Sequence, residues 1–250
     1  MPKALIEEHG DVAVLRLADG VTNPIGPALV GDLDAALTTV ERNFRAMVLA
    51  GGEKFFSIGF NLPELIEFDR AQMSDFFTSF NDLSLRLLTL AMPTVCSISG
   101  HAIAGGTILA LTTDFRVAAS EKKLMGLNEV KLGLPVPYLA DLLLRQTVSA
   151  PAANRILFTG DFLTTSDAEK IGLVDEIAPV AAVEARAVEK TAAVAALPAD
   201  GLCAIKENRY EAAARRYKKR GREKNEHFLD CWFAAASRPL LEEAADTFSR

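Results

Sequence analysis

The chain has 250 residues, of which 50% are hydrophobic and 24% charged, so it can bury a full core in one or two domains. Its net charge of −6 speaks against a nucleic-acid or membrane-surface partner, and three well-separated cysteines leave an odd thiol that suits a reducing compartment. No apolar run reaches the roughly 18 residues that span a bilayer, and no signal-peptide pattern opens the chain, so we expect a cytoplasmic protein.

The first half of the chain reads as strands that alternate with helices. A hairpin is predicted at 3–8 and 11–17, and buried strands at 46–50, 94–99 and 115–119. Helical patterns lie between them, at 28–40, 71–91 and 106–112. This alternation is typical of an α/β fold with a largely parallel sheet.

Beyond about residue 137 the strand signal nearly vanishes. Helices are predicted at 138–147, 150–158, 166–171, 181–196, 199–220 and 222–247, with one last short strand at 174–177. We therefore divide the chain into a core, 1–197, and a helical C-terminal region, 198–250. The composition leaves open whether this region packs on its own core or on a neighbouring subunit.

Two glycine-centred turns are candidates for a ligand site. The first is Phe56-Ser57-Ile58-Gly59-Phe60-Asn61-Leu62, and the second is Gly100-His101-Ala102-Ile103-Ala104-Gly105-Gly106. Glycine lets a ligand approach the backbone closely, so such turns can offer it bare N–H groups. Two turns that face one place form a two-donor cradle for a developing oxyanion. The sequence alone does not show that these two turns converge.

Signatures of several other chemistries are absent from the sequence. It has no G-x-S-x-G elbow, Walker loop or G-x-G-x-x-G dinucleotide turn, and no C-x-x-C or H-E-x-x-H metal set. The chain holds only three histidines, so we expect no metal site. An enzyme built on this chain would work with carboxylates and backbone dipoles.

Five segments in order resemble the crotonase family, that is, the enoyl-CoA hydratase/isomerase superfamily. They are the two turns and the stretches 114–118, 126–134 and 159–174. The resemblance implies a spiral of ββα units with a helical C-terminal region that trimerises, giving a homotrimer or a hexamer. It also implies an acyl-CoA thioester as the substrate. Coenzyme A then arrives as part of the substrate, and no further cofactor is implied.

The resemblance also assigns the residues of the site. The backbone N–H groups of Ile58 and Gly105 hold the thioester oxygen, and Glu129 is the catalytic carboxylate. The residues that contact the substrate are Ile58, Gly59, Phe60, Asn61, Leu62 and Gly105. Glu129 lies among leucines, and burial there would raise the pKa of its carboxyl toward the working range of a base.

Position 108 bears on which reaction is catalysed. Hydratases of the family carry two glutamates, and one of these positions is Ile108 here. Water addition needs a water to be activated and a carbon to be protonated, whereas a double-bond shift needs one base that moves a proton from C2 to C4. The resemblance therefore predicts a Δ3,Δ2-enoyl-CoA isomerase of fatty acid metabolism. The alternatives are a hydratase, another acyl-CoA lyase or hydrolase, and a non-catalytic acyl-CoA-binding protein.

Other polar residues have mainly structural interpretations. We expect His101 to be packed and hydrogen-bonded and Asp114 to cap or stabilise a turn, while Ser57 lacks the partners of a nucleophile. A basic cluster can contact the CoA phosphates or form a solvated helix face, and Lys54 is another candidate contact. The cluster comprises Arg215, Arg216, Lys218, Lys219, Arg220, Arg222 and Lys224.

Overall fold

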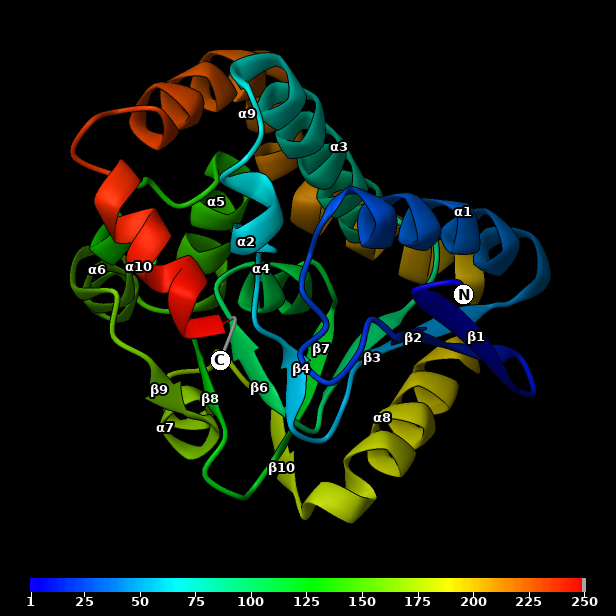
Figure 1. Ribbon diagram of the computed structural model, residues 1–250. Helices are drawn as coiled ribbons and strands as arrows, with labels where there is room; N and C mark the ends of the chain where they lie inside the picture. Colours follow the sequence, from blue (N-terminus) through cyan, green and yellow to red (C-terminus); the bar gives the residue numbers. More distant parts are fainter. Residues whose placement is uncertain (249–250) are drawn as a thin grey trace.

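The computed structural model describes residues 1–248 and contains two β-sheets (Figure 1). The larger sheet has six strands in the order β1-β2-β3-β5-β7-β10. These are β1 (Ala4–His9), β2 (Val12–Leu17), β3 (Ala46–Ala50), β5 (Thr94–Ile98), β7 (Phe115–Ala119) and β10 (Glu176–Ala178). The β1–β2 hairpin is antiparallel and all the other neighbours in this sheet are parallel. The predicted hairpin, buried strands and largely parallel sheet are thus confirmed.

The smaller sheet has four strands in the order β4-β6-β8-β9. They are β4 (Phe55–Ser57), β6 (His101–Ile103), β8 (Leu124–Gly126) and β9 (Leu163–Thr164), and only β9 is antiparallel to its neighbour. In the chain, β3 leads to β4, β5 to β6 and β7 to β8, and a helix follows each pair. This repetition is the spiral of ββα units that the family resemblance implied.

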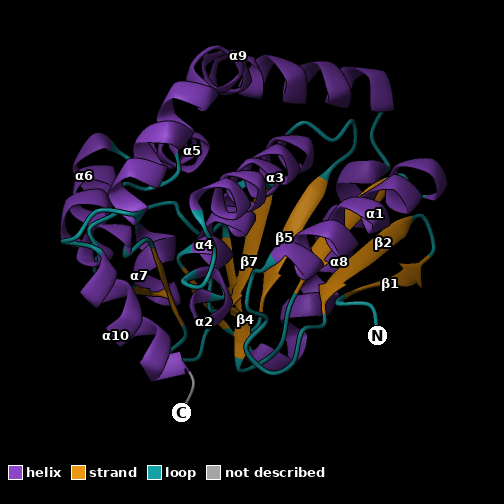
Figure 2. Ribbon diagram, turned by 45° about the horizontal axis from the view of Figure 1, so that its top comes forward, coloured by secondary structure: helices purple, strands orange, loops and turns teal. Residues whose placement is uncertain are grey.

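Helices cover both faces of the larger sheet. The helices up to this point in the chain are α1 (Pro27–Asn43), α2 (Leu62–Leu65), α3 (Arg70–Leu88), α4 (Gly105–Leu111), the 3₁₀ helix η1 (Glu129–Leu132), α5 (Tyr138–Thr147), α6 (Ala150–Thr159), α7 (Thr165–Lys170) and α8 (Val180–Ala195). Figure 2 shows α1 and α3 over one face of the strands. On the opposite face, Val183 and Ala187 of α8 pack against Val48, Val95 and Val117.

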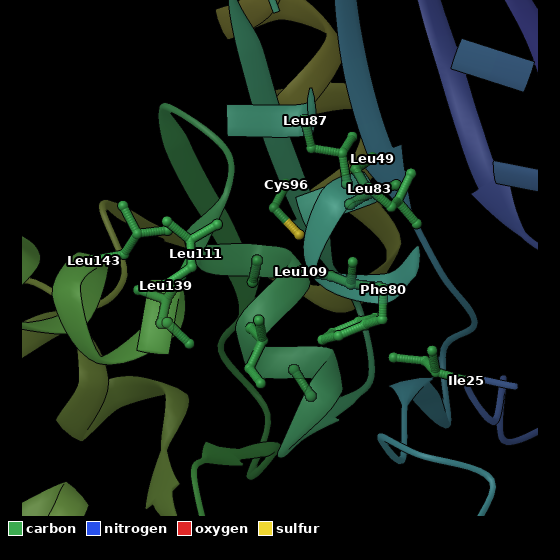
Figure 3. Packing of buried hydrophobic residues seen from close by; sticks show 14 of the residues in the cluster. Ile25, Leu49, Phe80, Leu83, Leu87, Cys96, Leu109, Leu111, Leu139 and Leu143 are labelled. Carbon is green, nitrogen blue, oxygen red and sulfur yellow. The ribbon is translucent and has the colours of Figure 1, made fainter. Parts of the chain in front are cut away.

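Helix α4 lies inside the molecule, and each of its residues is buried. Figure 3 shows Leu111 of α4 beside Leu139 and Leu143 of α5. Because neighbouring elements surround the helix, its first turn has a fixed position. That turn begins at Gly105, one of the predicted site residues.

Two C-terminal helices complete the fold, α9 (Ala199–Trp232) and α10 (Arg238–Phe248). The predicted break near Gly221 is wrong, because α9 continues through that glycine. A Cβ atom there would stand 2.9 Å from the ring of Tyr217, so the glycine makes room for a side chain and does not end the helix. Within this chain, α9 packs on α3 and α5, and α10 packs on α2. No helix in the described residues is long and apolar enough to cross a bilayer.

Candidate active site

A cavity of about 220 Å³ lies where the loops that follow β4, β6 and β8 meet. These strands are parallel neighbours, so their carboxyl ends lie at the same edge of the sheet. The residues that line the cavity from the ends of these strands and the segments that follow them are Ile58, Phe60, Leu62, Ile103, Ala104, Gly105, Asn128, Glu129, Leu132 and Leu134. Both glycine turns and the candidate carboxylate therefore reach one cavity.

The two turns touch each other through their backbones at Gly59 and Gly105. Gly59 has φ +89°, a conformation that L side chains rarely adopt. A Cβ atom on Gly59 would stand 2.9 Å from the carbonyl oxygen of Ile103 and 3.0 Å from the amide nitrogen of Gly105. A side chain does not fit between the two turns, which explains glycine at position 59.

The Ile58 amide does not have the role that the family resemblance assigned to it. Its N–H donates to the carbonyl oxygen of Thr22 at 3.0 Å, so it is not available to a ligand. The expectation that Ile58 supplies one donor of the cradle is corrected on this ground. Ile58 remains part of the cavity wall through its other atoms.

Two other amides at the cavity are available. The N–H of Phe60 has no hydrogen-bond partner among the described residues, although the flanking Gly59 carbonyl and Asn61 amide both pair with Ile25. Gly105 is the first residue of α4, and the first hydrogen bond of that helix runs from the Ile108 amide to the Ala104 carbonyl. The N–H of Gly105 therefore lacks an intrahelical partner.

Ala104, directly before Gly105, has a strained backbone. Its φ of +46° with ψ −111° is unusual for a residue with a Cβ atom. Its own N–H donates to the Gly126 carbonyl at 2.8 Å, which helps to hold this conformation. Strain of this kind costs about 1–3 kcal/mol and occurs most often at functional sites. Here the constrained backbone of Ala104 fixes the position of the Gly105 amide that follows it.

Glu129 is the acidic residue of the cavity. Glu129 is 6% exposed to solvent, and its Oε2 atom has no hydrogen-bond partner in the described part of the chain. Burial raises the pKa of this carboxyl to about 7. It is also the one ionisable side chain among the described residues that line the cavity. A carboxyl with this pKa can accept and release a proton near neutral pH.

Ile108 brings no second carboxylate to this region. It lies in the first turn of α4, is 2% exposed and belongs to the hydrophobic core. In the described residues, no three His, Cys, Asp or Glu side chains are close enough together to hold a metal ion.

Several other sequence-predicted residues have clear structural partners. The side chain of Asn61 donates to Glu64 at 2.6 Å, and neither Gly59 nor Asn61 lines the cavity. Ring nitrogen Nδ1 of His101 accepts the Leu124 N–H at 2.9 Å, as expected for a packed histidine. The hydroxyl of Ser57 donates to the Asn23 carbonyl at 2.7 Å. Contacts of the predicted substrate-binding residues with a substrate stay predictions.

The C-terminal helices supply a wall that sequence reasoning missed. Phe228 and Trp232 of α9 and Ala244 of α10 line the cavity. The ring of Phe228 stacks on that of Phe77 with centroids 3.9 Å apart and 11° between the planes. Helical periodicity marks these aromatics as buried but does not say what they pack against. The region 198–250 thus contributes to a cavity of its own chain.

The basic residues singled out in the sequence lie away from this cavity. None of the seven in α9 lines it, and three of them form ion pairs within the helix, Arg215 with Glu211 and both Arg220 and Lys224 with Glu223. The ammonium of Lys54 lies 5.9 Å from the centroid of the Phe55 ring. Their contact with a phosphate stays a prediction.

The family model described as "Enoyl-CoA hydratase/isomerase" matches residues 7–248 of this chain. The curated "Enoyl-CoA delta isomerase 1, mitochondrial" of Mus musculus is 31% identical over 191 residues, which are 74% of this chain and 66% of the relative. The Rattus norvegicus protein of the same name is 29% identical with the same coverage. The matched segment is thus slightly less than two thirds of the length of these relatives.

Solved structures agree with the sequence matches. The crystal structure of human mitochondrial delta3-delta2-enoyl-CoA isomerase superposes with a TM-score of 0.94 at 25% identity, covering 99% of this chain and 98% of that one. The enoyl-CoA hydratase EchA3 from Mycobacterium ulcerans superposes with a TM-score of 0.84 at 28% identity, covering 92% and 99%. The similar structures therefore include proteins described as isomerases and proteins described as hydratases.

Proposed function

The chain belongs to the enoyl-CoA hydratase/isomerase family, and on that basis we propose that it is a Δ3,Δ2-enoyl-CoA isomerase. The observation that supports this most is the isolation of Glu129, the one ionisable side chain among the described residues that line the cavity. A single carboxylate is enough to carry one proton between two carbons of a substrate. Hydration also requires a water to be positioned and activated, which a second acid would assist.

In the proposed reaction, the thioester oxygen accepts hydrogen bonds from the N–H groups of Phe60 and Gly105. These donors stabilise the negative charge that develops on the oxygen when a proton leaves C2. The Glu129 carboxylate takes this proton, and the electron pair spreads over a dienolate. The carboxyl then returns the proton to C4, so the double bond moves from C3–C4 to C2–C3. Atoms and charge balance because the proton that leaves C2 is replaced at C4.

The surroundings of Glu129 fit this chemistry. Burial keeps its pKa at about 7, so the group can act as a base and then as an acid. The leucine and aromatic side chains that complete the cavity suit a hydrocarbon chain. We keep as predictions a homotrimeric or hexameric assembly, a cytoplasmic location, a role in fatty acid metabolism and independence of any cofactor other than the substrate's own coenzyme A.

The test compares two substrates with the purified protein. We expect 3-enoyl-CoA to be converted to 2-enoyl-CoA without a change in mass, much faster than 2-enoyl-CoA gains a water. Mass spectrometry and the absorbance of the conjugated thioester separate the two products. Water addition as the dominant activity would identify a hydratase and reject the isomerase proposal. Tight acyl-CoA binding with no turnover of either substrate would instead indicate a non-catalytic member.

A further inference from the structure

A second cavity, of about 410 Å³, adjoins the candidate active site. It lies between the loop before α5, helix α6 and helix α9. Two residues, Leu134 and Phe228, line both cavities. Their side chains therefore stand between the two spaces.

Both residues of this partition are buried. Phe228 is 1% exposed and stacks on Phe77 with ring centroids 3.9 Å apart. Leu134 is 5% exposed, and its N–H donates to the backbone carbonyl of Glu129 at 3.0 Å. The partition is thus tied directly to the segment that carries the proposed proton shuttle.

Apart from Asn128 and Glu129, the residues that line the first cavity have apolar side chains or none. Leu132, Leu134 and Trp232 line it together with Phe228. A hydrocarbon tail is the chemical group that gains most from such a wall, about 0.8 kcal/mol for each buried methylene. A tail that extends past the reacting carbons in this direction meets Leu134 and Phe228.

From this geometry we propose that Leu134 and Phe228 set the upper length of the acyl chain that the site accepts. This inference rests on the proposed acyl-CoA function and adds to it a length limit and the residues that impose it. In the parent protein the second cavity is closed to the substrate. Shortening a partition side chain joins the two spaces and admits a longer chain.

The expected result is a shift in chain-length preference. Below the limit, kcat/KM rises by about fourfold for each added methylene, the rate equivalent of its burial. At the limit the rise stops. Leu134→Ala removes about three carbon atoms from the partition, so we expect the limit to move by about two to three carbons toward longer chains.

The experiment measures kcat/KM over a series of straight-chain 3-enoyl-CoA thioesters for the parent and for Leu134→Ala. Leu157→Ala is the control, since Leu157 lines only the second cavity, which the parent substrate does not enter. This control keeps the parent's length limit. Phe228→Leu provides a second partition variant if Leu134→Ala folds poorly.

A binding measurement separates failure of this inference from failure of the proposed function. Saturated acyl-CoA thioesters have no double bond to move, so their Kd, measured by calorimetry, reports the limit without catalysis. If a partition variant binds longer saturated acyl-CoA thioesters than the parent does, while 3-enoyl-CoA is not isomerised, the length-limit inference is supported and the isomerase proposal fails. If neither partition variant shifts the limit in turnover or in binding, the inference is overturned.

Discussion

Gly59 and Gly105 approach so closely that a methyl group on Gly59 would stand 3.0 Å from the Gly105 amide nitrogen. Gly59 directly precedes Phe60, so this contact sets the spacing between the two amides that we propose as donors. The cradle therefore depends on a backbone contact between two loops of different ββα units.

Replacing Gly59 by alanine tests this dependence. The new methyl group meets the Gly105 amide and the Ile103 carbonyl, so we expect a fall in kcat/KM of about 10²–10³, typical of losing one oxyanion donor. The φ of +89° adds about 1–3 kcal/mol of destabilisation, measured by urea unfolding. Gly10→Ala is the control, because Gly10 has φ +62° but no atom within 4 Å of an added Cβ. Equal turnover in the two variants would show that the contact does not shape the site.

Glu129→Gln removes the proposed proton shuttle but keeps the shape of the side chain. We expect isomerisation to fall by about 10²–10⁴ while the Kd for saturated acyl-CoA stays near the parent value. Glu67→Gln, at an exposed position outside the cavity, keeps parental turnover. Parental isomerisation by Glu129→Gln would remove this residue from the mechanism.

The pH dependence of the reaction follows from the raised pKa of Glu129. The base must be ionised to take the C2 proton, and burial places its pKa at about 7. We expect kcat/KM to level off above that pH and to fall by about tenfold for each unit below it. An activity that stays constant down to pH about 5.5, more than a unit below this pKa, would contradict the assignment.

Stability should depend on pH through the same group. Its ordinary pKa of 4.5 is raised to about 7 in the folded protein, so ionisation is disfavoured only there. Below pH 4.5 the carboxyl is protonated in both the folded and the unfolded protein, and it costs the folded state nothing. As pH rises from 4.5 to about 7, the unfolded protein loses this proton first, and the free energy of unfolding falls by at most about 3 kcal/mol. We therefore expect the free energy of unfolding of Glu129→Gln, relative to that of the parent, to increase as pH rises from 4.5 to about 7. Urea unfolding at several pH values measures this, and a pH-independent difference would refute it.

A buried ion pair anchors α9 to the core. The Lys206 ammonium donates to Oδ2 of Asp114 at 2.9 Å and to the Met92 carbonyl at 2.8 Å, while burial lowers the pKa of Lys206. Asp114→Asn leaves this ammonium buried without its counter-charge, and we expect a loss of about 3–5 kcal/mol in the free energy of unfolding.

Two further variants check the origin of that loss. Combining Asp114→Asn with Lys206→Met removes the buried charge, so most of the stability should return. Asp161→Asn breaks an exposed pair with Lys131 and should cost no more than about 1 kcal/mol. If the double variant is as unstable as the single one, the unpaired charge is not the cause.

The elements that the sequence predicted correctly are those with a continuous local pattern. Strand β3 is a run of five apolar residues, all buried, and helix α5 matches its predicted range of 138–147. The smaller sheet escaped prediction as a sheet, because its strands have two or three residues each and their pairing joins distant segments. The break expected at Gly221 failed for a similar reason, since only its packing against Tyr217 explains that glycine.

By itself, the sequence determined the α/β alternation, the two glycine turns and a glutamate placed among leucines, because these are patterns of neighbouring residues. Only the tertiary structure decided that the Thr22 carbonyl accepts the Ile58 N–H, while the N–H groups of Phe60 and Gly105 have no partner in the part of the chain that the structure describes. It also decided that Phe228 and Trp232 close the cavity and that burial raises the pKa of Glu129. Whether an amide has a partner, and how far a carboxyl is removed from water, depends on segments far away in the chain, and local patterns carry no information about those contacts.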